Sequence, residues 1–175
     1  MALRAADDRI RSAILAAGAL LVAVLAGCVE QGGPPPQGQA ARLPNEGFFF
    51  DQDGGEAKLA YGRANSDDVR LMLSCEAGKR RVEITDAAHG EARTGDMLVL
   101  TSGKSRSALP ASFEPNEETG GQLVIAHADL ALPALDGFRR SGAIAVKLGA
   151  REYALSATAG ERAGIAQFFS ACDRR

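Results

Sequence analysis

The chain has 175 residues, of which 46% are hydrophobic and 24% charged, and its formal net charge at pH 7 is −2. Its basic residues form only short clusters, such as residues 79–81 and 139–140, so nucleic acid and anionic lipid surfaces are not expected partners. Tryptophan is absent and aromatic residues amount to 5%, which argues against a surface that stacks on carbohydrate rings.

The N-terminal region has the pattern of an export signal. Arg4, Arg9 and Arg11 precede an apolar run over residues 13–27. This run is shorter than the roughly 20 apolar residues with which a helix crosses the core of a bilayer. We therefore expect a cleaved signal peptide rather than a permanent transmembrane helix.

The apolar run ends in Leu25-Ala26-Gly27-Cys28, which resembles the lipobox of bacterial lipoproteins. The resemblance implies cleavage before Cys28, diacylglycerol on its sulfur and acylation of the new amino terminus, so that a lipid bilayer is the partner of this end. In enteric members of this family, an aspartate after the cysteine favours the inner membrane. Val29 stands here, which implies the outer membrane, facing the periplasm. The alternative is an ordinary signal peptide cleaved elsewhere.

The composition divides the chain into three regions. Residues 28–44 are rich in glycine, proline and glutamine, and their three consecutive prolines favour an extended polyproline II conformation. We expect a lipoprotein signal peptide over residues 1–27, a Gly/Pro-rich tether over residues 28–44, and a β-rich globular domain over residues 45–175. The third region is long enough to form one domain with its own core.

Alternation of apolar and polar residues predicts most of this domain to be strands. The clearest strand covers residues 69–75, where Val69, Leu71, Leu73 and Cys75 share one face. A turn after Cys75 leads to a returning strand, so that the two form a hairpin. The ranges of the predicted strands are 48–50, 58–61, 69–75, 81–85, 97–101, 122–127, 143–147 and 151–155.

Two segments have helical periodicity instead. A short helix is predicted over residues 130–140. A longer amphipathic helix follows Thr158, which together with Glu161 fits a capping box. The residues of its apolar stripe are Ile165, Phe168, Phe169 and Cys172. The expected fold is mainly β: an antiparallel sandwich or small barrel with a C-terminal amphipathic helix packed on it.

The three cysteines have different expected roles. With Cys28 assigned to lipid, Cys75 and Cys172 remain, and the oxidising periplasm favours a disulfide between them. Each of these two cysteines lies on the apolar face of its element, so both are expected to point into the same core. The alternative is two separate buried thiols. Neither cysteine has a second ligand at a spacing typical of a metal site.

Few residues suggest a catalytic or metal-binding site. Residues 51–54 resemble the start of a calcium loop, but Gly62 stands where the bidentate glutamate is required, so a turn is favoured. His127 and Asp129 are two residues apart on a strand, but His89 is the only other histidine. Ser105 lacks the glycine frame of a nucleophile elbow. We therefore predict no catalytic residue, no metal and no cofactor.

The hairpin around Cys75 has one further resemblance. Residues 74–79 (SCEAGK), followed by Val82-Glu83-Ile84, are similar to the strand–Cys–x–x–Gly–strand element of small periplasmic lysozyme-inhibitor lipoproteins. That family's inhibitory loop has no clean counterpart, because residues 101–106 lack the tyrosine. The favoured function is a membrane-anchored, non-catalytic envelope lipoprotein that binds an envelope protein partner or assists assembly. A lysozyme inhibitor and an envelope hydrolase with an unrecognised site are the alternatives.

Overall fold

The computed structural model describes residues 42–88, 95–117 and 120–174. The expected signal peptide, Cys28 and nearly all of the expected tether lie outside these residues. Within them, no helix is long and apolar enough to cross a membrane.

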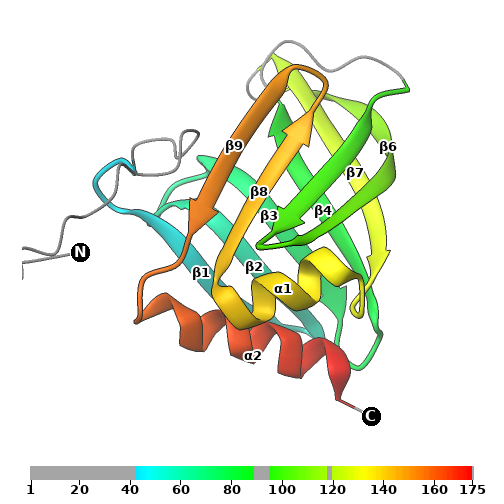
Figure 1. Ribbon diagram of the computed structural model, residues 1–175. Helices are drawn as coiled ribbons and strands as arrows, with labels where there is room; N and C mark the ends of the chain where they lie inside the picture. The colour runs from blue at the N-terminus through cyan, green and yellow to red at the C-terminus, as the bar shows by residue number, and fades with distance from the viewer. Residues whose placement is uncertain (1–41, 89–94, 118–119, 175) are drawn as a thin grey trace, which may run out of the picture. The chain divides into compact units, whose positions relative to one another are not determined.

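The described residues form nine strands and two helices (Figure 1). In chain order these are β1 (Glu46–Asp53), β2 (Glu56–Arg63), β3 (Val69–Glu76), β4 (Arg81–Ala88), β5 (Met97–Ser102), β6 (Ser105–Asn116), β7 (Gly121–Asp129), α1 (Pro133–Ser141), β8 (Ala143–Leu148), β9 (Arg151–Ser156) and α2 (Glu161–Asp173).

All nine strands belong to one antiparallel sheet with the order β1-β2-β3-β4-β7-β6-β5-β8-β9. The sheet curls into a half-barrel, and both helices lie at one end of it (Figure 1). The inner face carries the core, because apolar side chains alternate along the strands: Leu71 and Leu73 of β3 and Val82 and Ile84 of β4 are all buried. The expected mainly β fold with a C-terminal helix is confirmed.

Strand β6 was not predicted, because it carries Pro110 and Pro115 and few large apolar residues. A central strand normally excludes proline, which cannot donate to the ladder. Here each half of β6 has a partner on one side only: its first half pairs with β5, as far as Pro110 opposite Met97, and its second half pairs with β7. Each proline therefore lies in a half-strand with one free edge.

The two helices pack through phenylalanines at the helical end of the half-barrel. Phe168 and Phe169 of α2 and Phe138 of α1 are fully buried, and the rings of Phe138 and Phe169 lie 6.2 Å apart. Phe48 of β1 joins them, with its ring 5.2 Å from that of Phe138. The predicted stripe of α2 is thus its buried face, and both predicted helices are confirmed within a few residues.

Half of the predicted capping box is present at the start of α2. The backbone N–H of Thr158 donates to the Glu161 carboxylate at 2.9 Å, but the N-cap residue is Gly160 and no side chain caps the helix. Glu161 instead binds the chain that enters β1. It forms an ion pair with Arg42 and accepts the backbone N–H of Phe48. Glu161 therefore links the start of α2 to the chain segment that enters β1.

Cys75 at the end of β3 and Cys172 near the end of α2 lie at disulfide-bonding distance, with their Cα atoms 5.9 Å apart. Both residues are buried, and 97 positions separate them in the sequence. The pairing expected from the two apolar faces agrees with this placement. It ties the last helix to the third strand of the sheet.

Candidate functional site

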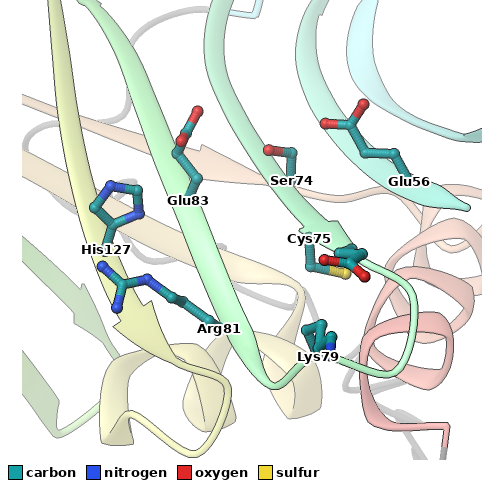
Figure 2. Close-up of a pocket in the computed structure, with 8 residues that line it drawn as sticks. Glu56, Ser74, Cys75, Lys79, Arg81, Glu83 and His127 are labelled. Carbon is teal, nitrogen blue, oxygen red and sulfur yellow. The ribbon is translucent and has the colours of Figure 1, made fainter.

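The outer face of the sheet carries a row of three polar side chains on neighbouring strands. Ser74 of β3 is directly opposite Glu83 of β4, and Glu83 is directly opposite His127 of β7. These residues line a pocket of about 440 Å³ together with charged side chains, as Figure 2 shows. Besides Glu83, the charged residues in its lining are Glu56, Glu76, Lys79 and Arg81.

The order of the row determines what it can do chemically. A serine nucleophile needs a base within hydrogen-bonding reach, and the base in turn needs a third group that orients it. Here the carboxylate of Glu83 stands between Ser74 and His127, and two inter-strand spacings, about 9.5 Å, separate the strands of the serine and the histidine. The pocket therefore offers donors and acceptors from the row and both signs of charge from Glu83, Lys79 and Arg81 to a ligand, without a serine–histidine contact.

The structure also shows where Ser105, His127 and Asp129, the candidate residues for a hydrolase, lie. His127 and Asp129 line a smaller pocket of about 280 Å³ with Arg81, whereas Ser105 begins β6 opposite Ser102 and does not line it. The Asp129 carboxylate accepts the backbone N–H of Ala131 at 2.7 Å, which fixes the turn between β7 and α1. The three candidates thus do not form one site.

The weak metal motifs have structural explanations. Residues 51–54 lie in the hairpin between β1 and β2, where Gly54 adopts a φ of +56°. His89 lies outside the described residues. Among residues 42–88, 95–117 and 120–174, no group of three His, Cys, Asp or Glu side chains could hold a metal ion.

A second polar cluster, which the sequence analysis did not predict, lies on the inner face. The Asp86 side chain of β4 is completely buried; it accepts the hydroxyl of Tyr153 at 3.0 Å and forms an ion pair with Arg151, both of β9. The Arg151 guanidinium also lies 5.0 Å from the centre of the Tyr153 ring. Strands β4 and β9 are not neighbours in the sheet, so these contacts run across the interior of the half-barrel.

Arg70 and Glu46 extend this inner cluster. The Arg70 guanidinium lies 5.7 Å from the centre of the Tyr153 ring and 3.6 Å from the Glu46 carboxylate, which is 6% exposed. Regular alternation along β3, in which Leu71 faces inward, would put Arg70 on the outer face. The register of β2 and β3 instead shifts between Tyr61 and Gly62, which leaves Arg70 as the extra residue of a β-bulge. Bulges re-aim side chains in this way.

The inner cluster holds Tyr153 in its neutral form. Burial raises the pKa of the Tyr153 phenol well above its usual value of 10.0, and the neighbouring Asp86 carboxylate raises it further. Arg151 and Arg70 act in the opposite direction, but less strongly. Tyr153 therefore acts as a hydrogen-bond donor to Asp86.

A signal for part of this cluster was present in the sequence. Asp86 follows Val82 and Ile84 at two-residue spacing, and Tyr153 precedes Leu155 at the same spacing, so strand periodicity alone puts both polar residues on the inner face. The bulge that turns Arg70 inward has no comparable signal, because a one-residue shift depends on the pairing of two strands.

Comparisons with protein-family models, with curated proteins and with solved structures find no match for this chain.

Proposed function

We propose that the chain is an envelope lipoprotein, anchored through Cys28 on the periplasmic side of the outer membrane, whose β-domain binds an envelope protein without catalysis. The observation that supports binding is the order of the outer-face row, in which Glu83 separates Ser74 from His127. Such a row can recognise a ligand through hydrogen bonds and charges, but it lacks the contact that would activate a serine.

The anchoring part of the proposal rests on the sequence of residues 25–28 and on the tether that follows. It is tested by the intact mass of protein extracted from membranes. The expected product begins at Cys28 and carries acyl groups, and a Cys28→Ala variant should yield no acylated chain. A soluble wild-type product with a free thiol at position 28, or one cleaved elsewhere, contradicts it.

The binding part is tested on the membrane-anchored protein. Photo-crosslinking residues introduced on the outer face should give reproducible adducts with an envelope protein. The same preparation should show no turnover on a panel of hydrolase substrates. A separate assay of lysozyme inhibition tests the resemblance around Cys75. Turnover that is lost in Ser74→Ala, Ser105→Ala, His127→Ala or Asp129→Ala would refute the proposal in favour of a hydrolase.

A further inference from the structure

We propose that a groove on the outer face of β3, β4, β7 and β6 binds an extended peptide segment of the partner in which basic and apolar residues alternate. This inference rests on the proposed binding function and names the part of the domain that would serve it. The acidic groove, as we call it, has a volume of about 940 Å³. Its lining residues are Asp67, Asp68, Val69, Met72, Thr85, Ala87, Pro115, Asn116, Glu117 and Leu123.

The floor of the acidic groove is apolar. Val69 and Met72 of β3 and Leu123 of β7 are half-buried and lie on the outer face. No described helix or strand forms a second layer over this face (Figure 1). The position of these side chains follows from the register, because Met72 lies opposite Thr85 and Leu123 lies opposite Ala87. These side chains offer apolar surface that a bound chain would remove from water.

The rim of the acidic groove is negatively charged. Asp67, Asp68 and Glu117 are exposed, and those lining residues of the groove that the structure describes include no lysine, arginine or histidine. Among the described residues near the rim, Arg63 lies 3.5 Å from the Asp68 carboxylate, but both side chains are more than half exposed, so this ion pair contributes little.

The β-bulge explains why Arg70 is absent from the described lining of the groove. With regular alternation, Arg70 would stand on the outer face beside Met72, and Val69 would stand on the inner face with Leu71. The bulge turns Arg70 to the inner face, against Tyr153 and Glu46. The same register shift therefore completes the inner cluster and leaves only acidic charges among the described residues that line the groove.

Size and charge together select the occupant. The four strands under the groove span three inter-strand spacings, about 14 Å, which is the length of about four residues of extended chain. Alternate side chains of such a chain point to opposite sides, so apolar residues can contact the floor while lysines or arginines reach the rim. An anionic lipid surface would be repelled by the same rim.

The test uses fluorescence anisotropy of a labelled peptide of about nine residues, long enough to cross the groove, with alternating lysine and valine. A second peptide replaces each lysine by glutamate and leaves the valines. The expected result is saturable binding of the lysine peptide and none of the glutamate peptide. In the variant Asp67→Asn/Glu117→Gln, affinity for the lysine peptide should fall about tenfold, since electrostatic complementarity is removed without a change in shape.

The matched control is Asp51→Asn/Asp53→Asn, which removes the same charge from the exposed β1–β2 hairpin and should bind the lysine peptide as the wild type does. Equal midpoints of thermal unfolding for the two variants show that a difference in affinity does not come from a loss of folding. Equal binding of the two peptides, or equal affinity of the groove variant and the wild type, overturns the proposal. So does binding to anionic lipid vesicles that depends on Asp67 and Glu117, which would make the groove a membrane contact.

A crosslinker at position 72 separates this inference from the proposed function. The groove is supported if the partner segment recovered there carries a net positive charge and the lysine peptide competes with it. Adducts formed only at other outer-face positions overturn the groove while the binding function stands. Absence of any envelope adduct from every outer-face position contradicts the binding function itself.

Discussion

The hydroxyl of Tyr153 donates to the carboxylate of Asp86 at 3.0 Å. This hydrogen bond joins β9, at the edge of the sheet, to β4, a strand near the middle of the sheet. A curled sheet with two free edges could open, but contacts across its interior hold the edge strand β9 over the inner face. With Arg151 paired to the same carboxylate, the three residues stabilise the curvature of the half-barrel as well as its core.

The first prediction concerns the free energy of unfolding. Asp86→Asn should lower it by about 2–3 kcal/mol, because the substitution leaves Arg151 without its buried counter-charge. Tyr153→Phe removes only one hydrogen-bond donor and should cost about 1 kcal/mol. Urea unfolding measures both, and Lys147→Ala, at an exposed position of β8, is the control that should change little. An Asp86→Asn variant as stable as the wild type would show that the inner cluster does not hold the sheet.

The second prediction is a loss of stability at alkaline pH. Tyrosines of the unfolded chain ionise near pH 10, whereas burial and then Asp86 raise the pKa of Tyr153 in the folded protein well above that. Above about pH 10 the unfolded state therefore binds fewer protons than the folded state, so the free energy of unfolding falls as pH rises. Below that pH this residue contributes no pH dependence.

Two measurements check this alkaline prediction. The chain has two tyrosines, and burial also raises the pKa of Tyr61. Phenolate absorbance in the ultraviolet should therefore rise only as the protein unfolds, and Tyr153→Phe should flatten the dependence of stability on pH. A phenolate signal that titrates near pH 10 in protein that is still folded would contradict the proposed environment of these side chains.

The third prediction is that Cys75 and Cys172 form a disulfide that holds α2 on the sheet. Cys172→Ser should then lower the free energy of unfolding by about 2–4 kcal/mol, because the bond constrains a long loop of the unfolded chain. The C-terminal helix should also become sensitive to protease before the strands do. Cys75→Ser/Cys172→Ser is the control and should be no less stable than the single variant. Peptide mapping without reductant decides the pairing, and two separately alkylated thiols from oxidised folded protein would exclude it.

The fourth prediction tests the β-bulge. A Cβ atom at Gly62 would overlap the carbonyl oxygen of Asp68 and lie 2.9 Å from Val69 Cα, so β3 must shift to accept Gly62→Ala. We expect a loss of about 1–3 kcal/mol, as for other overpacked sites. Gly160→Ala is the matched control, because a Cβ there meets no atom within 4 Å. Equal urea midpoints for the two variants would show that the close approach at Gly62 does not constrain the bulge.

The sequence predicted those parts of the fold that local patterns determine. Alternation along residues 69–75 placed the strand and Cys75, and the stripe from Ile165 to Cys172 placed the helix and Cys172. The prediction was wrong for Val69, because the bulge at Arg70 puts Val69 on the face opposite to Leu71. Strand β6 was missed because Pro110 and Pro115 are acceptable only once the change of partner from β5 to β7 is known. Strand order and the inward position of Arg70 likewise depend on pairing between segments that are distant in the sequence. No local pattern of residues predicts such pairing.

The bonds around Glu161 have a mechanical consequence. Any tension that reaches the domain through the chain before Arg42 acts first on the ion pair between Arg42 and Glu161 and on the bond from Glu161 to the backbone of Phe48. Beyond these, β1 would unzip from β2 one pair at a time, starting at Glu46 opposite Arg63. Through Glu161, a force applied at the N-terminus is therefore borne by the start of α2 as well as by the edge strand β1. Glu161→Gln should lower the force at which that edge yields in single-molecule extension from the N-terminus.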